Sequence, residues 1–178
     1  DRVDRLAAVL AAAHAWHDAI STSFRAAEAF VQNGEMDRAH HALDRMEDAL
    51  LAASIARTDP RWGDAWLTRA RAHARRGEVD EAEAALQQAH VHAHHYGPER
   101  AANMALLAGQ IAHRRGEWDR AAGLYQDAVE VFHGHGDTAG LAAVLQDMGE
   151  LDSARGSWER AVMYFESALE IFQASGDV

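Results

Sequence analysis

The sequence predicts an all-α protein built from repeated pairs of antiparallel helices. Two observations carry this prediction: the amino-acid composition and an internal repeat. Forty of the 178 residues are alanine and only two are proline. This composition favours helix throughout, because alanine loses least and proline most on entering a helix. The length also suffices for one domain with a sizeable buried core.

Four glycines anchor the internal repeat. Gly34, Gly77, Gly116 and Gly156 are separated by 43, 39 and 40 residues. The segments around them align as QNGEMDRAHHAL, RRGEVDEAEAAL, RRGEWDRAAGLY and ARGSWERAVMYF. Self-similarity at this period is typical of a stacked array of helix pairs.

The aligned columns each have a physical role. The glycine ends one helix in the left-handed region, where a Cβ would be costly. Two residues later comes an apolar side chain, which we expect to plug the core: Met36, Val79, Trp118, Trp158. The next residue is an acid, which suits the positive end of a new helix. A small residue five positions after the glycine lets two helices approach closely: Ala39, Ala82, Ala121, Ala161. Nine positions after the glycine the residue is large and apolar, and seven before it the residue is small.

Capping residues predict where the first helix of each pair begins. Asp59-Pro60 and Gly97-Pro98 fit an N-cap followed by the first helical position, and Asp137 caps the fourth pair. The first pair has no such signal near Trp16. Instead, one apolar stripe at a spacing of three to four residues runs through Val3, Leu6, Leu10, Ala13, His17, Ile20, Phe24, Ala27 and Val31. We expect either one helix over 2–32 or a bend near Ser21, and the continuous stripe favours the unbroken helix.

These residues resemble the tetratricopeptide repeat (TPR) family over roughly residues 16–178. The resemblance implies a TPR-like α-solenoid, a right-handed superhelix of about four helix-turn-helix repeats over 16–57, 59–96, 98–135 and 137–176. Residues 1–15 would form an N-terminal helical extension, and residues 1–178 a single repeat domain. The long period resembles the ~40-residue variants of bacterial regulators and scaffold adaptors. The alternative is another αα-hairpin repeat with similar packing.

The TPR resemblance also implies a binding surface, because first helices in that family line a concave groove for peptides. Carrying the family positions over places these polar residues in the groove: Arg71, Arg75, Asn103, Gln110 and Arg114. Arginine and amide side chains suit carboxylates and peptide backbone. We therefore expect a site for an acidic or C-terminal peptide. The alternative is a solvated helix face.

Twelve histidines raise the question of a metal site. His90 and His94 would share one helical face, and His133 stands at the repeat position equivalent to His94. Such spacing is compatible with metal ligands, but no acid or cysteine completes a tight site. We therefore expect no physiological metal and no cofactor. A solvated cluster at a helix C-terminus is the alternative, and titration of the histidines near pH 6 is a further one.

Composition and missing motifs exclude several other classes. The net charge of −11 argues against nucleic-acid binding and against docking on an anionic membrane. The absence of cysteine excludes disulfides and thiol catalysis. No phosphate loop, nucleophile elbow or zinc-protease motif is present. We therefore expect no enzymatic activity and a cytoplasmic protein.

The sequence thus predicts a non-enzymatic protein–protein interaction module. One alternative is a ligand-sensing or oligomerisation domain of a bacterial regulator, and another is metal or pH sensing through the histidines. The last repeat lacks the polar capping helix that repeat arrays need. We expect either that this chain is a fragment of a longer one, or that it forms a homo-oligomer through the uncapped C-terminal repeat.

Overall fold

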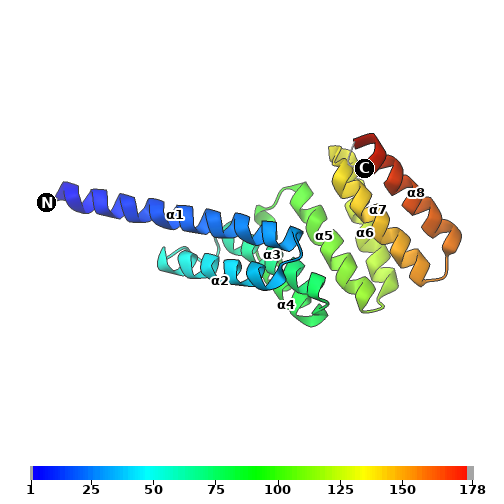
Figure 1. The fold of residues 1–178 in the computed structure, drawn as a ribbon, viewed down its shortest axis with the longest axis horizontal. Helices are drawn as coiled ribbons and strands as arrows, with labels where there is room; N and C mark the ends of the chain where they lie inside the picture. Colours follow the sequence, from blue (N-terminus) through cyan, green and yellow to red (C-terminus); the bar gives the residue numbers. More distant parts are fainter. Residues whose placement is uncertain (1, 176–178) are drawn as a thin grey trace. The chain divides into compact units, whose positions relative to one another are not determined.

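The computed structural model describes the backbone of residues 2–175 and the side chains of residues 5, 9 and 11–174. Within these residues the chain forms α-helices and one short 3₁₀ helix, η1, and no strand (Figure 1). The elements are α1 (Arg2–Gln32), α2 (Met36–Ala52), α3 (Pro60–Arg76), α4 (Val79–His90), η1 (Ala93–His95), α5 (Pro98–Arg114), α6 (Trp118–His135), α7 (Thr138–Ala154) and α8 (Trp158–Ser175).

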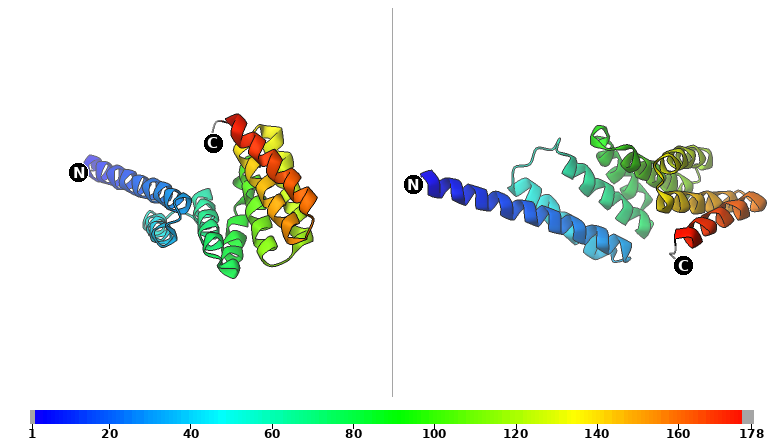
Figure 2. Two further views of the ribbon diagram at one scale, coloured as in Figure 1. Left: turned by 45° about the vertical axis from the view of Figure 1, so that its right-hand side comes forward. Right: turned by 90° about the horizontal axis from the view of Figure 1, so that it is seen from above.

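The helices pair in chain order, and each pair is antiparallel (Figure 2). The chain divides into two compact units, residues 1–95 and 96–178. Unit 1 contains α1–α4 and unit 2 contains α5–α8. Each unit therefore holds two of the expected repeats, and the single domain over 1–178 stays a prediction.

Local sequence signals set the helix ends. Gly34, Gly77, Gly116 and Gly156 all have φ between 76° and 80°, the left-handed region predicted for them. Asp59 caps α3 by accepting a hydrogen bond from the Arg61 backbone N–H, and Asp137 caps α7 in the same way through Gly140. These contacts satisfy backbone groups that an uncapped helix end would leave unpaired.

Small and large residues alternate in the core. The four alanines five positions after the glycines are buried. In unit 2, Tyr125 of α6 is fully buried against Gly109 of α5, and Phe165 of α8 packs on Gly149 of α7. A Cβ at either glycine would lie within 3 Å of the ring. The small column is therefore what lets the two helices of a pair approach.

Two expectations for the second helices are wrong. Trp118 and Trp158 do not plug the core: 42% and 67% of their surfaces are exposed. Both residues stand at the first helical position, before the helix turns its apolar face inward. The tryptophan in the core is instead Trp62, in the first turn of α3.

The first helix is unbroken, as the apolar stripe predicted. Its second half packs on α2, and Ile20, Ala27 and Val31 are buried there. Its first half extends beyond α2 within unit 1, leaving Val9 and Trp16 exposed (Figure 1). The stripe residues Val3, Leu6 and Leu10 lie outside the described side chains.

Candidate functional site

A polar surface lies on the first helices of unit 2. We name it the unit 2 polar face, and it consists of Asn103, Gln110 and Arg114 from α5 with Asp147 and Glu150 from α7. The three α5 residues are seven and four positions apart, so they share one side of the helix. The Gln110 Nε2 donates to Asp147 Oδ2 at 2.7 Å and joins the two helices.

Asp147 is the electrostatic centre of this face. Burial raises the pKa of Asp147 to about 6, and the negative charge of Glu150 adds to the rise. The hydrogen bond from Gln110 and the charge of Arg114 act in the opposite direction. The carboxylate is therefore ionised at neutral pH at a cost in solvation, which a hydrogen-bond donor or a cation from a partner could reduce.

Two further groups interact with the carboxylates of this face. The Tyr125 hydroxyl is buried and has no hydrogen-bond partner among the described residues. Burial raises the pKa of this hydroxyl, and the charges of Asp147 and Glu150 raise it further. Burial also lowers the pKa of His113, against the attraction of Glu150. Both groups are therefore neutral at pH 7.

The two arginines predicted for the binding site in unit 1 have structural contacts. Arg75 donates from Nη1 to the backbone oxygen of Val31 at 2.7 Å and reaches that of Gln32 at 3.4 Å. These are carbonyls in the last turn of α1, which the helix itself leaves unpaired. Arg75 thus fastens α3 to the end of α1. Arg71 also has an interaction partner and is half-buried.

The predicted histidine cluster does not have the expected helical geometry. The second helix of repeat two ends at His90, so His90 and His94 do not share a helical face. Histidine is a weak helix former, and hydrogen bonds of the 3₁₀ type follow: His92 N donates to Ala89 O and His95 N to His92 O. The His94 and His95 rings contact each other at a tilt of 42°, with centroids 3.9 Å apart. His133 lies in the other unit, in the last turn of α6.

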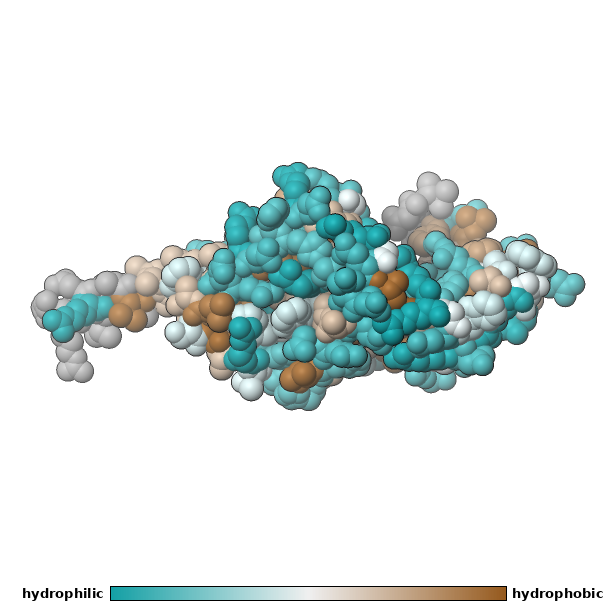
Figure 3. Space-filling view, turned by 90° about the horizontal axis from the view of Figure 1, so that it is seen from below, coloured by the Kyte–Doolittle hydropathy of each residue, from teal (hydrophilic) through white to brown (hydrophobic). Residues whose placement is uncertain are grey.

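An open apolar hollow lies in unit 1, where α1 extends past the end of α2. Its volume is about 450 Å³. The lining comes from both helices and from the segment after α2: Val9, Ala12, Ala13, Trp16, His17, Ile20, Ala52, Ala53, Ile55 and Arg61. In the space-filling view, brown and pale brown apolar surface occurs at the left, toward the N-terminal end of unit 1 (Figure 3).

Paired antiparallel helices with αL glycines, an invariant small column and a polar first-helix face define a helical-repeat protein. The family model of the tetratricopeptide repeat matches residues 100–174, which span most of unit 2. Residues 100–174 therefore carry tetratricopeptide repeats, and the resemblance read from the sequence is confirmed there. This is an all-α, TPR-like solenoid fold, which generally serves as a non-enzymatic scaffold for protein binding.

A solved structure has the same fold. It is described as "Crystal structure of MamA" and matches with a TM-score of 0.57 at 20% sequence identity. The match covers 89% of this chain and 81% of that one. At this identity the likeness concerns the fold alone. No protein of curated function matches the chain. Among the described residues, no helix is both long and apolar enough to cross a bilayer.

Proposed function

We propose that this protein binds a peptide or partner segment on the first helices of its repeats. The observation that carries the proposal is the Gln110–Asp147 hydrogen bond on the unit 2 polar face. Partial burial of the Asp147 carboxylate costs solvation free energy. Packing of the two helices alone would not require a charged group at this position. On a surface of a protein-binding fold, it supports a role in recognition.

The side chains of the unit 2 polar face suit an extended peptide. The amides of Asn103 and Gln110 can exchange hydrogen bonds with peptide N–H and C=O groups. Arg114 is exposed and offers a fork for a carboxylate, and Asp147 with Glu150 offers acceptors for a cation. The sequence predicted an acidic or C-terminal peptide as the ligand. We broaden this prediction to a peptide segment that carries both negative and positive charges. Arg71 and Arg75 remain proposed contacts in unit 1.

Selection from a displayed peptide library tests this proposal. The affinities of peptides selected on the whole chain are then measured for the variants Gln110→Ala and Arg114→Glu. Arg120→Glu is the matched control. Arg120 lies on α6 and pairs with Glu117. We expect at least a tenfold loss of affinity for the first two variants and none for the control. Equal affinities for all three variants and the parent protein would refute the site.

Self-association is a second candidate function, favoured by the outer face of α8. Trp158, Val162, Phe165 and Leu169 are spaced by three or four residues, so they form one stripe, and between 39% and 67% of each is exposed. On α6 the equivalent positions after Trp118 are packed into the core of unit 2: Ala122 and Val129 are partly buried, and Tyr125 is fully buried. We propose that a second copy covers the α8 stripe, as α7 covers α6.

Light scattering after size-exclusion chromatography tests the second candidate. We expect a dimer for the parent chain and a monomer for the double variant Val162→Glu/Leu169→Glu. The control is Gln126→Glu, at an exposed position of α6. A monomeric parent chain at about 100 μM would contradict self-association, because burial of such a stripe should hold a dimer at that concentration. The ~40-residue period also supports the proposal of a bacterial regulator or scaffold.

A further inference from the structure

Three metal-ligating side chains of unit 1 meet at the contact between α2 and α3. His40 comes from the second turn of α2, His73 from the last turn of α3, and Glu78 from the turn before α4. One ligand atom from each lies within 4.8 Å of the other two. All three side chains are half-buried. The residues differ from the histidine cluster predicted from the sequence.

The His40 imidazole has an unused nitrogen. Its Nε2 atom is buried and has no hydrogen-bond partner among the described residues. Its ring lies against the His73 ring, with centroids 4.4 Å apart. Burial lowers the pKa of His40, as do the nearby His73, Arg69 and Arg76. A neutral imidazole with its proton on Nδ1 offers the Nε2 lone pair to a metal, and the proposal requires this tautomer of His40.

His73 and Glu78 form a preassembled pair. The His73 Nδ1 lies 2.6 Å from Glu78 Oε2. This interaction with His73 lowers the pKa of Glu78, so its carboxylate is ionised. Arg76 Nε holds the other carboxylate oxygen, Oε1, at 2.8 Å. The second oxygen is thereby directed to His73, and a cation can replace the proton between the two groups.

The surrounding arginines do not leave an excess of positive charge. Arg69 pairs with Asp44 and Glu47 at 2.8 and 2.7 Å. Arg76 pairs with Asp37 as well as with Glu78. Each arginine thus has two carboxylates, and the site remains open to a divalent cation.

The repeat itself does not require these residues. In unit 2 the equivalent positions hold Ala122, Asp152 and Ser157, counted from Gly116 and Gly156. Asp152 there forms an ion pair with Arg160. The same helix contact is therefore built without histidine, so the trio in unit 1 adds a property that packing does not need.

We propose that His40, His73 and Glu78 bind a zinc-type divalent transition metal ion. Two imidazoles and one carboxylate form a ligand set that zinc accepts, with water in the fourth position. Ligand atoms around tetrahedral zinc lie about 3.3 Å apart, given metal–ligand distances near 2.0–2.1 Å. Side-chain rotations that shorten separations of up to 4.8 Å would bring the trio to that spacing. The bound ion links α2, α3 and the following turn.

Calorimetric titration of the whole chain with zinc chloride tests the proposal. We expect one site with a dissociation constant of about 10 μM or tighter, above the weak binding of the other histidines. Affinity at this site should fall at least tenfold in His40→Ala and in Glu78→Gln. It should be unchanged in His41→Ala, the exposed neighbour on α2, and in His90→Ala/His94→Ala. Magnesium chloride should give no heat, because magnesium prefers oxygen ligands.

Thermal unfolding gives a second measurement. Zinc should raise the Tm of the parent chain and of His41→Ala, but not that of Glu78→Gln. Glu78 lies in a turn, so this variant keeps the fold even where His40→Ala does not, and far-ultraviolet circular dichroism checks both. The absence of a tight zinc site in the parent chain would overturn the proposal. A site that survives Glu78→Gln and is lost in His90→Ala/His94→Ala would do so as well.

Discussion

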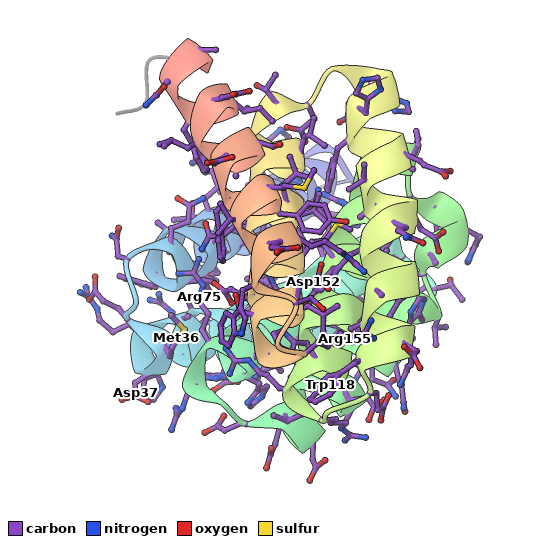
Figure 4. All side chains as sticks on the ribbon, turned by 90° about the vertical axis from the view of Figure 1, so that its right-hand side faces the viewer. Met36, Asp37, Arg75, Trp118, Asp152 and Arg155 are labelled. Atoms are coloured by element: carbon purple, nitrogen blue, oxygen red, sulfur yellow. The ribbon has the colours of Figure 1, made fainter. Side chains whose placement is uncertain are left out.

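Arg155 in unit 2 donates from Nη2 to Asp119 Oδ1 at 2.7 Å and thereby ties the end of α7 to the start of α6. Figure 4 shows Arg155 close to Trp118, the residue before Asp119. Unit 1 repeats the contact: Arg76 at the end of α3 donates to Asp37 at the start of α2, also at 2.7 Å. In each unit, the arginine directly before one repeat glycine forms an ion pair with an aspartate of the preceding repeat. That aspartate lies three residues after the glycine of its own repeat.

The contribution of this pair to stability should be small. Asp119 is fully exposed, and exposed pairs contribute roughly 0–1 kcal/mol. We expect Arg155→Met to lower the free energy of unfolding by less than about 0.5 kcal/mol. Arg69 is the contrast, since only 15% of its side chain is exposed and it pairs with two carboxylates. Arg69→Met should cost about 1–2 kcal/mol. Urea unfolding measures the free energy of unfolding of both variants. A larger loss for Arg155→Met than for Arg69→Met would contradict the account.

The small column before each glycine predicts a steric effect. In Gly109→Ala the new Cβ would lie 2.4 Å from a Tyr125 ring carbon. We expect a loss of about 2 kcal/mol from overpacking. The matched control is Gly123→Ala on α6, where a Cβ meets nothing within 4 Å. This control should gain up to about 1 kcal/mol, because alanine favours helix over glycine.

A double variant isolates the cause of that loss. Gly109→Ala combined with Tyr125→Leu should recover part of the stability, measured against Tyr125→Leu alone. The two substitutions should therefore be non-additive in urea unfolding. Strict additivity would show that the ring does not press on residue 109.

Stability should depend on pH through Asp147. The folded carboxyl keeps its proton up to about pH 6, whereas an ordinary carboxyl loses it near 3.8. Between these values the folded state binds more protons than the unfolded state, so this group lowers stability as pH rises. Asp147→Asn keeps an acceptor for Gln110 without the charge. We expect the variant to be more stable by on the order of 1–2 kcal/mol at pH 8 and nearly unchanged at pH 3.5.

Thermal unfolding at the two pH values checks this prediction. Glu130→Gln, at an exposed position of α6, serves as the control for loss of a negative charge. The outcome that contradicts the account is an equal gain for both variants at pH 8, because a general reduction of the net charge would then explain it.

The sequence predicted the features that local chemistry sets. The αL glycines, the caps at Asp59 and Asp137 and the long first helix depend on residues close together in the chain. The contacts of the sites depend on packing. The contact of Arg75 with the end of α1 depends on how α3 packs on α1. The contact of His40 with His73 depends on the register between the first two repeats. The burial of Asp147 could not be read from its position in the repeat alone.

The helical end at His90 and the exposed tryptophans show the limits of aligned columns. A column assigns the same role to each repeat, but α4 stops earlier than α6 does. Trp118 and Trp158 occupy the column of Met36 and Val79, yet both side chains are largely exposed, whereas Trp62, also in a first helical turn, is buried. The alignment of the repeats predicts which residues are equivalent. The burial and contacts of each residue depend on its surroundings in the folded protein.

Hydrogen exchange with a selected peptide bound tests most directly that first helices form the binding surface. We predict that bound peptide slows exchange in α5 and α7, around Asn103–Arg114 and Gln146–Glu150, and leaves α6 and α8 unchanged. Protection confined to α6 and α8, with none on the helices that carry Gln110 and Asp147, would contradict the account.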